Sequence, residues 1–265
     1  MSLAGIEGMC AAAADLVAVA ATLTPAQWDT DTAAAGWSVK DVFIHVGTLL
    51  ELLQAAVAGA EAPPVGVEAL NDAVVAAHRG WTTKQTMDFL AAQLNSAVPA
   101  FTALQQEPLA STPAPMLDLG SYPLHTIADM FTFDMITHLR WDVLAPRGPI
   151  PSHLGPLDEV RLTPAVSWLI GGLAQMQPGL AAHVRAPIAL QLTGPAARTL
   201  VLQGSTSGLV VKHDPQDLSD VAATITSPTE NFLAWSTKRV PWSPVTTVTG
   251  DTTVATDFLG SVNLI

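Results

Sequence analysis

Two side chains that can bind a metal ion, Asp134 and His138, lie four residues apart in the largely apolar segment 123–144. On a helix, residues at this spacing project from one face on consecutive turns. Unpaired polar groups are costly on an apolar face, so this pair predicts either a metal site or a tight hydrogen bond. His125 and Asp129 have the same spacing but fall on the opposite side of the helix, where we expect them to face solvent.

A third candidate ligand, His45, lies in an earlier segment in which apolar residues recur at helical spacing, residues 39–58. Ser38 followed by Asp41 resembles a capping box and predicts where this helix begins. Taken alone, a histidine on a buried face is more often paired with a backbone carbonyl than bound to a metal. Two histidines and one acid on two helices nevertheless form a set from which helical bundles commonly build metal sites.

One further acid, Asp142, follows His138 by one helical turn. A carboxylate at this position is a candidate acceptor for the second ring nitrogen of a ligand histidine. A solvated surface acid explains the same spacing equally well, so both interpretations stay open.

The elements that must position these residues change character along the chain. Apolar periodicity and capping signals predict helices up to about residue 147, separated by a long loop over residues 107–122. The proline-rich segment 148–163 is predicted to be a linker, and Thr163-Pro164 is predicted to cap the helix that follows it. The helices predicted in the first part cover residues 6–23, 39–58, 67–79, 83–106 and 123–144.

After the linker, short β-type runs alternate with helices, which predicts a second domain of the α+β class. Residues 227–230 have the sequence of a capping box and are predicted to open a helix over 231–239. We therefore expect two domains, 1–147 and 164–265. The predicted strands cover residues 188–192, 199–202, 209–212, 222–225 and 245–248, and a closing helix is predicted over 251–264.

Composition excludes several classes of protein. The net charge is −12, with eleven lysines and arginines, which argues against binding to nucleic acid or to an anionic membrane surface. Cys10 is the only cysteine, so no intramolecular disulfide can form. The chain has neither the basic and apolar pattern of a signal peptide nor an apolar run of transmembrane length. These features together predict a cytoplasmic location.

Several motifs, taken in order, resemble a known family. WSVKDVFIHVG resembles the second-helix pattern of the DinB-like superfamily, and FDMITHLRWDVL resembles its fourth-helix pattern of an acid followed four residues later by histidine. GPAARTLVL and ENFLAWSTKR resemble the carboxy-terminal domain of the mycothiol-dependent maleylpyruvate isomerases. The resemblance extends over nearly the whole chain. It implies an α+β protein of two domains, a DinB-like four-helix bundle followed by a small sterol-carrier-like α+β domain.

The resemblance also implies a site. In this family three residues bind a divalent metal, usually zinc with nickel as an alternative, and they correspond to His45, Asp134 and His138. The isomerases usually have glutamate at the position of Asp134. Arg239 corresponds to the family's catalytic arginine, and Arg79 is a second match. Lys238 stands where the isomerases have glycine.

The resulting hypothesis is a metal-dependent enzyme that uses mycothiol or another low-molecular-weight thiol. The metal-bound thiolate would add to a small electrophilic, carboxylate-bearing substrate and either leave again after isomerisation or remain attached to it (S-transfer). The alternative is a non-catalytic protein that binds a small molecule or lipid and has a structural metal site. We expect a monomer or a homodimer.

Overall fold

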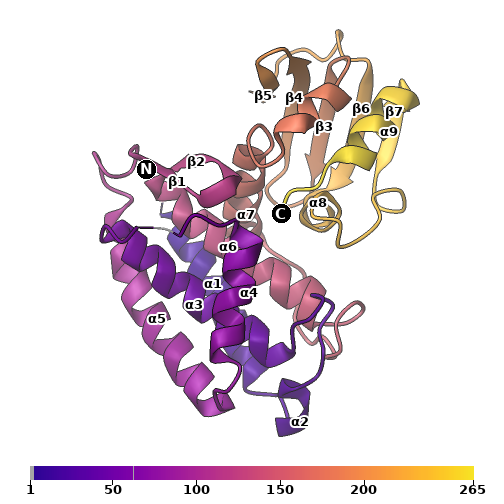
Figure 1. Cartoon of the computed structure of the whole chain (residues 1–265). Coiled ribbons are helices and arrows are strands. Elements are labelled where there is room, and N and C mark those ends of the chain that lie inside the picture. The colour runs from indigo at the N-terminus through magenta and orange to yellow at the C-terminus, as the bar shows by residue number, and fades with distance from the viewer. Residues whose placement is uncertain (1–2, 62) are drawn as a thin grey trace.

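The computed structural model describes residues 3–61 and 63–265, and it contains a helical region followed by a mixed sheet with its own helices (Figure 1). The α+β class predicted from the sequence is confirmed. The helices of the first part are α1 (Ala4–Ala20), α2 (Pro25–Trp28), α3 (Val39–Val57), α4 (Val67–His78), α5 (Thr83–Ala103), α6 (Ile127–Thr137) and α7 (Glu159–Gly172), and α6 continues into a π-helical turn, His138–Val143.

The helical region is organised around α3 and α6, the two helices that carry the candidate ligands. Helix α3 packs against α4 and α5, and α6 packs against α1 and α7. The predicted capping box of α3 is present: the Ser38 hydroxyl accepts from the Asp41 amide, and the Asp41 carboxylate accepts from the Ser38 amide. This cap fixes the first turn of α3, two turns before His45.

The second region is a five-stranded sheet in the order β5-β4-β3-β6-β7. The central strand β3 is parallel to its neighbour β6, and the other neighbouring pairs are antiparallel. Helix α8 follows β6 directly and packs against α7 of the helical region, so it lies where the two regions meet (Figure 1). The elements of this region are β3 (Ile188–Thr193), β4 (Arg198–Ser205), β5 (Gly208–His213), β6 (Ala223–Pro228), α8 (Thr229–Ser236), β7 (Thr247–Gly250) and α9 (Thr252–Ser261).

Three local predictions were wrong. The segment 107–122, predicted to be a loop, contains most of a short hairpin, β1 (Pro113–Pro115) with β2 (Ser121–Pro123). Helix α7 begins at Glu159 with Asp158 as its cap, so Pro164 lies inside the helix. Residues 227–230 form no side-chain cap on α8, because the Ser227 hydroxyl accepts from the Trp235 indole and donates to a backbone carbonyl.

The division of the chain at residues 148–163 stays a prediction. Helix α7, which begins within that segment, packs against α1 and α6 as well as α8, so it belongs to the packing of both regions. None of the described helices is long and apolar enough to cross a membrane.

The expectation that His125 and Asp129 face solvent was also wrong. Both side chains are half-buried, and a His125 ring nitrogen lies 2.8 Å from the Ala110 carbonyl oxygen. The outer face of α6 is covered because α1 packs against it, and Gly5 leaves room there for the Asp129 carboxylate. Burial raises the pKa of Asp129 to about 7, although the positive charge of Arg198 opposes this shift.

The raised pKa predicts how pH changes stability. An unfolded aspartate has a pKa of about 3.9, so the folded protein retains the Asp129 proton longer and its stability falls as pH rises from about 4 to about 7. Asp129→Asn removes this loss. We expect the variant to gain on the order of 1–3 kcal/mol in free energy of unfolding at pH 8 and little at pH 4. Urea unfolding at both pH values measures it, and equal gains would contradict the assignment.

Candidate metal centre

His45 from α3 and Asp134 and His138 from α6 and its continuation form one cluster, in which the ligand atoms all lie within 4.8 Å of one another. The Nε2 atom of His45 is 3.1 Å from Oδ1 of Asp134, and the Nε2 atom of His138 is 3.6 Å from the same oxygen. Two atoms bound to one tetrahedral zinc ion at ordinary bond lengths are about 3.4 Å apart. The observed spacing therefore suits a single small cation.

An unpaired polar atom of the cluster also fits a cation. Oδ2 of Asp134 is buried and has no hydrogen-bond partner among the described residues. Burial raises the pKa of the Asp134 carboxyl, but the charges of His45, His138 and Arg239 and the His45 hydrogen bond outweigh it and lower the pKa overall. The carboxylate is therefore ionised at neutral pH, as a metal ligand must be.

Asp142 is the acceptor that fixes His138. Its Oδ2 atom lies 2.9 Å from Nδ1 of His138, and its side chain is only 2% exposed, so the alternative of a solvated surface acid was wrong. Arg147 donates to Oδ1 at 3.0 Å, and Arg239 donates to Oδ2 through Nη2 at 2.9 Å. Because Asp142 holds Nδ1 of His138, the lone pair on Nε2 is directed to the cluster.

Trp37 covers both histidines. Its ring centroid lies 4.9 Å from that of His45 and 5.7 Å from that of His138, and its indole N–H donates to Asp72 of α4 at 2.9 Å. This hydrogen bond ties the covering ring to α4. The ring of Trp37 thereby restrains both imidazoles.

Arg239 is held by an unusual turn at the end of α8. Lys238 has a φ of 58°, the left-handed region that favours glycine. Its ammonium donates to the Gly260 carbonyl at 2.9 Å, near the end of α9, and that bond offsets part of the strain. The turn directs the Arg239 guanidinium across the junction to Asp142.

Arg79 lies elsewhere. It follows α4, donates to the Gly36 carbonyl at 2.7 Å, and pairs with Asp41 at 3.4 Å. Among the described residues that line the two cavities beside the cluster, Arg79 does not appear. These contacts support a structural link between α4 and the start of α3, and a catalytic role for Arg79 stays a prediction.

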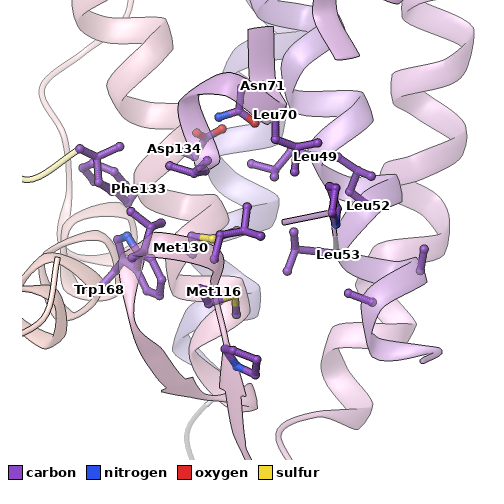
Figure 2. A pocket seen from close by; sticks show the side chains of 18 of the residues that line it. Leu49, Leu52, Leu53, Leu70, Asn71, Met116, Met130, Phe133, Asp134 and Trp168 are labelled. Atoms are coloured by element: carbon purple, nitrogen blue, oxygen red, sulfur yellow. The ribbon is translucent and has the colours of Figure 1, made fainter. Parts of the chain in front are cut away.

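Two cavities of different character meet at the cluster, and Asp134, His138 and Arg239 border both. The apolar cavity, about 180 Å³ in volume, lies among α3, α4, α6 and α7 (Figure 2). The polar cleft is larger, about 670 Å³ in volume. The apolar cavity is lined mainly by Leu49, Leu53, Leu70, Met130, Phe133 and Trp168, and the polar cleft by Trp37, Glu68, Asp72, Asp118, Asp142 and Arg147.

Sequence reasoning missed Asn71, Trp37 and Arg147 as parts of this site. Asn71 lies on the face of α4 that borders both cavities, and no local motif marks it. Trp37 precedes the cap of α3, a position that predicts only a packing contact. Arg147 lies beside the predicted linker, where a cation has no assigned partner until the chain folds.

The fold and the cluster together define an α+β protein with a helical N-terminal part, which holds a candidate metal centre, and a C-terminal sheet domain. A family model for the mycothiol maleylpyruvate isomerase N-terminal domain matches residues 10–143. The chain belongs to this family, as its motifs predicted.

Two solved structures have the same fold. One is the mycothiol-dependent maleylpyruvate isomerase, with a TM-score of 0.60, 14% sequence identity, and coverage of 94% of this chain and 93% of that one. The other is a histidine-to-alanine mutant of that enzyme, with the same TM-score and coverage and 13% identity. A comparison with curated proteins found no match.

The role of Asp142 predicts a pH-dependent effect of removing its charge. Burial raises its pKa, but the His138 hydrogen bond and the charge of Arg239 outweigh this and hold the pKa at about 2. The stabilisation is therefore complete above about pH 4 and is lost as pH falls to about 2. We expect Asp142→Asn to lower the free energy of unfolding by about 2–3 kcal/mol at pH 7, and by less below pH 4.

Urea unfolding of the metal-free protein measures this difference, and Asp220→Asn, at an exposed loop position, is the control. Asp142→Asn should also bind zinc about 10–100-fold more weakly than wild type, because it loses the anion that holds His138. A variant that matched wild type in both measurements would contradict the assignment.

Proposed function

We propose that this protein is a metal-dependent enzyme that uses a low-molecular-weight thiol, mycothiol, to isomerise a small electrophilic substrate or to become attached to it through the thiol sulfur (S-transfer). The observation that carries the proposal is the cluster of His45, Asp134 and His138, in which Asp134 and His138 border both cavities. Family membership supports the thiol and the isomerase chemistry. We further propose a cytoplasmic protein, a monomer or homodimer, that binds neither nucleic acid nor membranes.

The three residues would hold zinc, or nickel, since two imidazoles and a carboxylate suit both ions. A metal ion at such a site lowers the pKa of a thiol, so that the thiol reacts as a thiolate at neutral pH. In an isomerisation, the thiolate sulfur adds to one carbon of a double bond, and the neighbouring carbonyl takes up the electron pair. The remaining single bond rotates, and cleavage of the C–S bond returns the thiolate.

The chain's own residues orient this chemistry. Asp142 holds the ring of His138, and Trp37 covers both imidazoles, so the ligand set is restrained before any ligand binds. The Nε and Nη2 groups of Arg239 both donate hydrogen bonds to Asp142. We therefore propose that Arg239 positions His138 through Asp142 and also supplies positive charge for a substrate carboxylate at the border of the cavities.

The second candidate function is a non-catalytic binding protein with a structural metal. The apolar cavity supports binding of an apolar molecule, but it borders Asp134 and His138 and lies mainly in the helical region. This position favours a ligand that meets the metal centre. A binding site enclosed by the sheet domain alone would favour the second candidate.

Metal content is the first test. We expect protein purified without chelator to contain close to one zinc or nickel ion per chain by elemental analysis, and His45→Ala, His138→Ala protein to contain little. His153→Ala, which removes an exposed histidine, is the matched control and should retain the metal. Metal-free wild-type protein, or a double variant that keeps its metal, would rule out the centre.

A rate measurement distinguishes the roles of Arg239 and Arg79. With mycothiol and zinc-loaded protein, we expect thiol-dependent isomerisation of maleylpyruvate or substitution on 1-chloro-2,4-dinitrobenzene, both followed by absorbance. Arg239→Lys keeps the charge but loses the planar fork, and should lower the rate about 10–100-fold. Arg79→Lys tests the second predicted arginine in the same assay: a similar loss of rate would support its catalytic role, and an unchanged rate would leave it a structural link between α4 and α3. Zinc-loaded protein with no thiol-dependent turnover of either compound would favour a stabilising metal.

A further inference from the structure

The apolar cavity is built unlike a site for a small, highly charged substrate. Leu53 of α3 and Leu70 of α4 stand along one side, and Met130, Phe133 and Trp168 of α6 and α7 stand opposite (Figure 2). Leu53 and Leu70 are only half-buried, so a ligand in the cavity would remove further apolar surface from water. A charged group placed among these side chains would lose its hydration without gaining a partner.

Unpaired polar atoms gather at the same cavity. Four side-chain atoms of its lining residues are buried without a hydrogen-bond partner in the described part of the chain: Asn71 Oδ1, Asp134 Oδ2, Thr137 Oγ1 and Trp168 Nε1. Buried polar atoms are normally paired, and an unpaired one needs an explanation. Asn71 and Asp134 lie together at one end of the cavity (Figure 2). A ligand with a hydroxyl or N–H group at that end would pair with the Asn71 oxygen.

The volume limits the apolar part of the ligand. A cavity of about 150 Å³ lined by aliphatic and aromatic side chains accepts a benzene ring. The present cavity, at about 180 Å³, therefore accommodates a phenyl ring or an aliphatic chain of similar size. Its contact with Asp134 and His138 places the first atoms of such a group beside the candidate metal centre.

We propose that the electrophilic substrate carries an uncharged phenyl-sized group, that this group occupies the apolar cavity, and that the polar body of the thiol occupies the polar cleft. This inference rests on the proposed function, because it places the reacting carbon between the two cavities at the metal centre. The polar cleft suits the thiol because its wall presents Glu68, Asp72, Asp118 and Arg147 as partners for hydroxyl and amide groups. The substrate class is thus an aryl or alkyl electrophile, and any carboxylate it bears lies at the Arg239 end.

The test compares two probes with the same metal-binding group, acetohydroxamate and phenylacetohydroxamate, by calorimetric titration of zinc-loaded protein. We expect the phenyl compound to bind about tenfold or more tightly, because only it reaches the cavity. Leu53→Trp fills the cavity and should remove this advantage. Val57→Trp, one turn further along α3 at an exposed position outside the lining, should keep it.

A second pair of variants serves if Leu53→Trp does not fold. Leu70→Trp blocks the cavity from α4, and Ala69→Trp, at the exposed neighbouring position, is its control. Equal affinities for the two hydroxamates in wild-type protein would overturn this inference and leave the metal centre standing. Failure of both to bind would remove the metal centre, and the link between cavity and centre with it. Toluene, which has no metal-binding group, then tests the cavity alone: it should raise the melting temperature of wild type and Val57→Trp but not of Leu53→Trp.

Discussion

The buried carboxylate of Asp142 is the charge on which the site and the junction of the two regions depend. It has lost nearly all contact with water, and its charge is balanced by Arg147, Arg239 and the ring of His138. A buried charge left without partners is strongly destabilising. The C-terminal region supplies Arg239, so the position of α8 and the orientation of a candidate metal ligand are set by one electrostatic arrangement.

The cluster lies where two different environments meet, and this division gives the site its chemical character. Leucines, methionines and aromatic rings line one cavity, and carboxylates with arginine line the other. Electrostatic interactions strengthen in surroundings that exclude water. The proposed reaction centre between the two would therefore hold the polar thiol on the side of the charged residues and the apolar group of the substrate on the side of the apolar residues.

The family fold is kept although sequence identity with the solved isomerase structures is only 13–14%. What persists is the overall arrangement of helices and sheet, whereas most single positions differ. Lys238 illustrates this, because it adopts the backbone conformation that favours glycine and offsets its strain by capping α9. Asp134 reaches His45 directly, at 3.1 Å.

The sequence by itself determined the local features. The spacing of Asp134 and His138, the cap of α3 and the change from helical to strand periodicity follow from interactions within a few residues, and each survived folding. It also placed His45 on a buried face, because one apolar stripe defines a helix's inner side. Asp129 marks the limit of this reasoning, since periodicity cannot show that a second helix covers the outer face of α6.

Only the tertiary structure decided which distant residues meet. Asp142 and Arg239 are far apart in the chain, as are Trp37 and Asp72, and their pairing depends on how helices and domains dock. The apolar cavity is likewise invisible in the sequence, because its leucines and aromatic residues look the same there as those of a filled core. A cavity is a property of packed surfaces, and no single segment carries it.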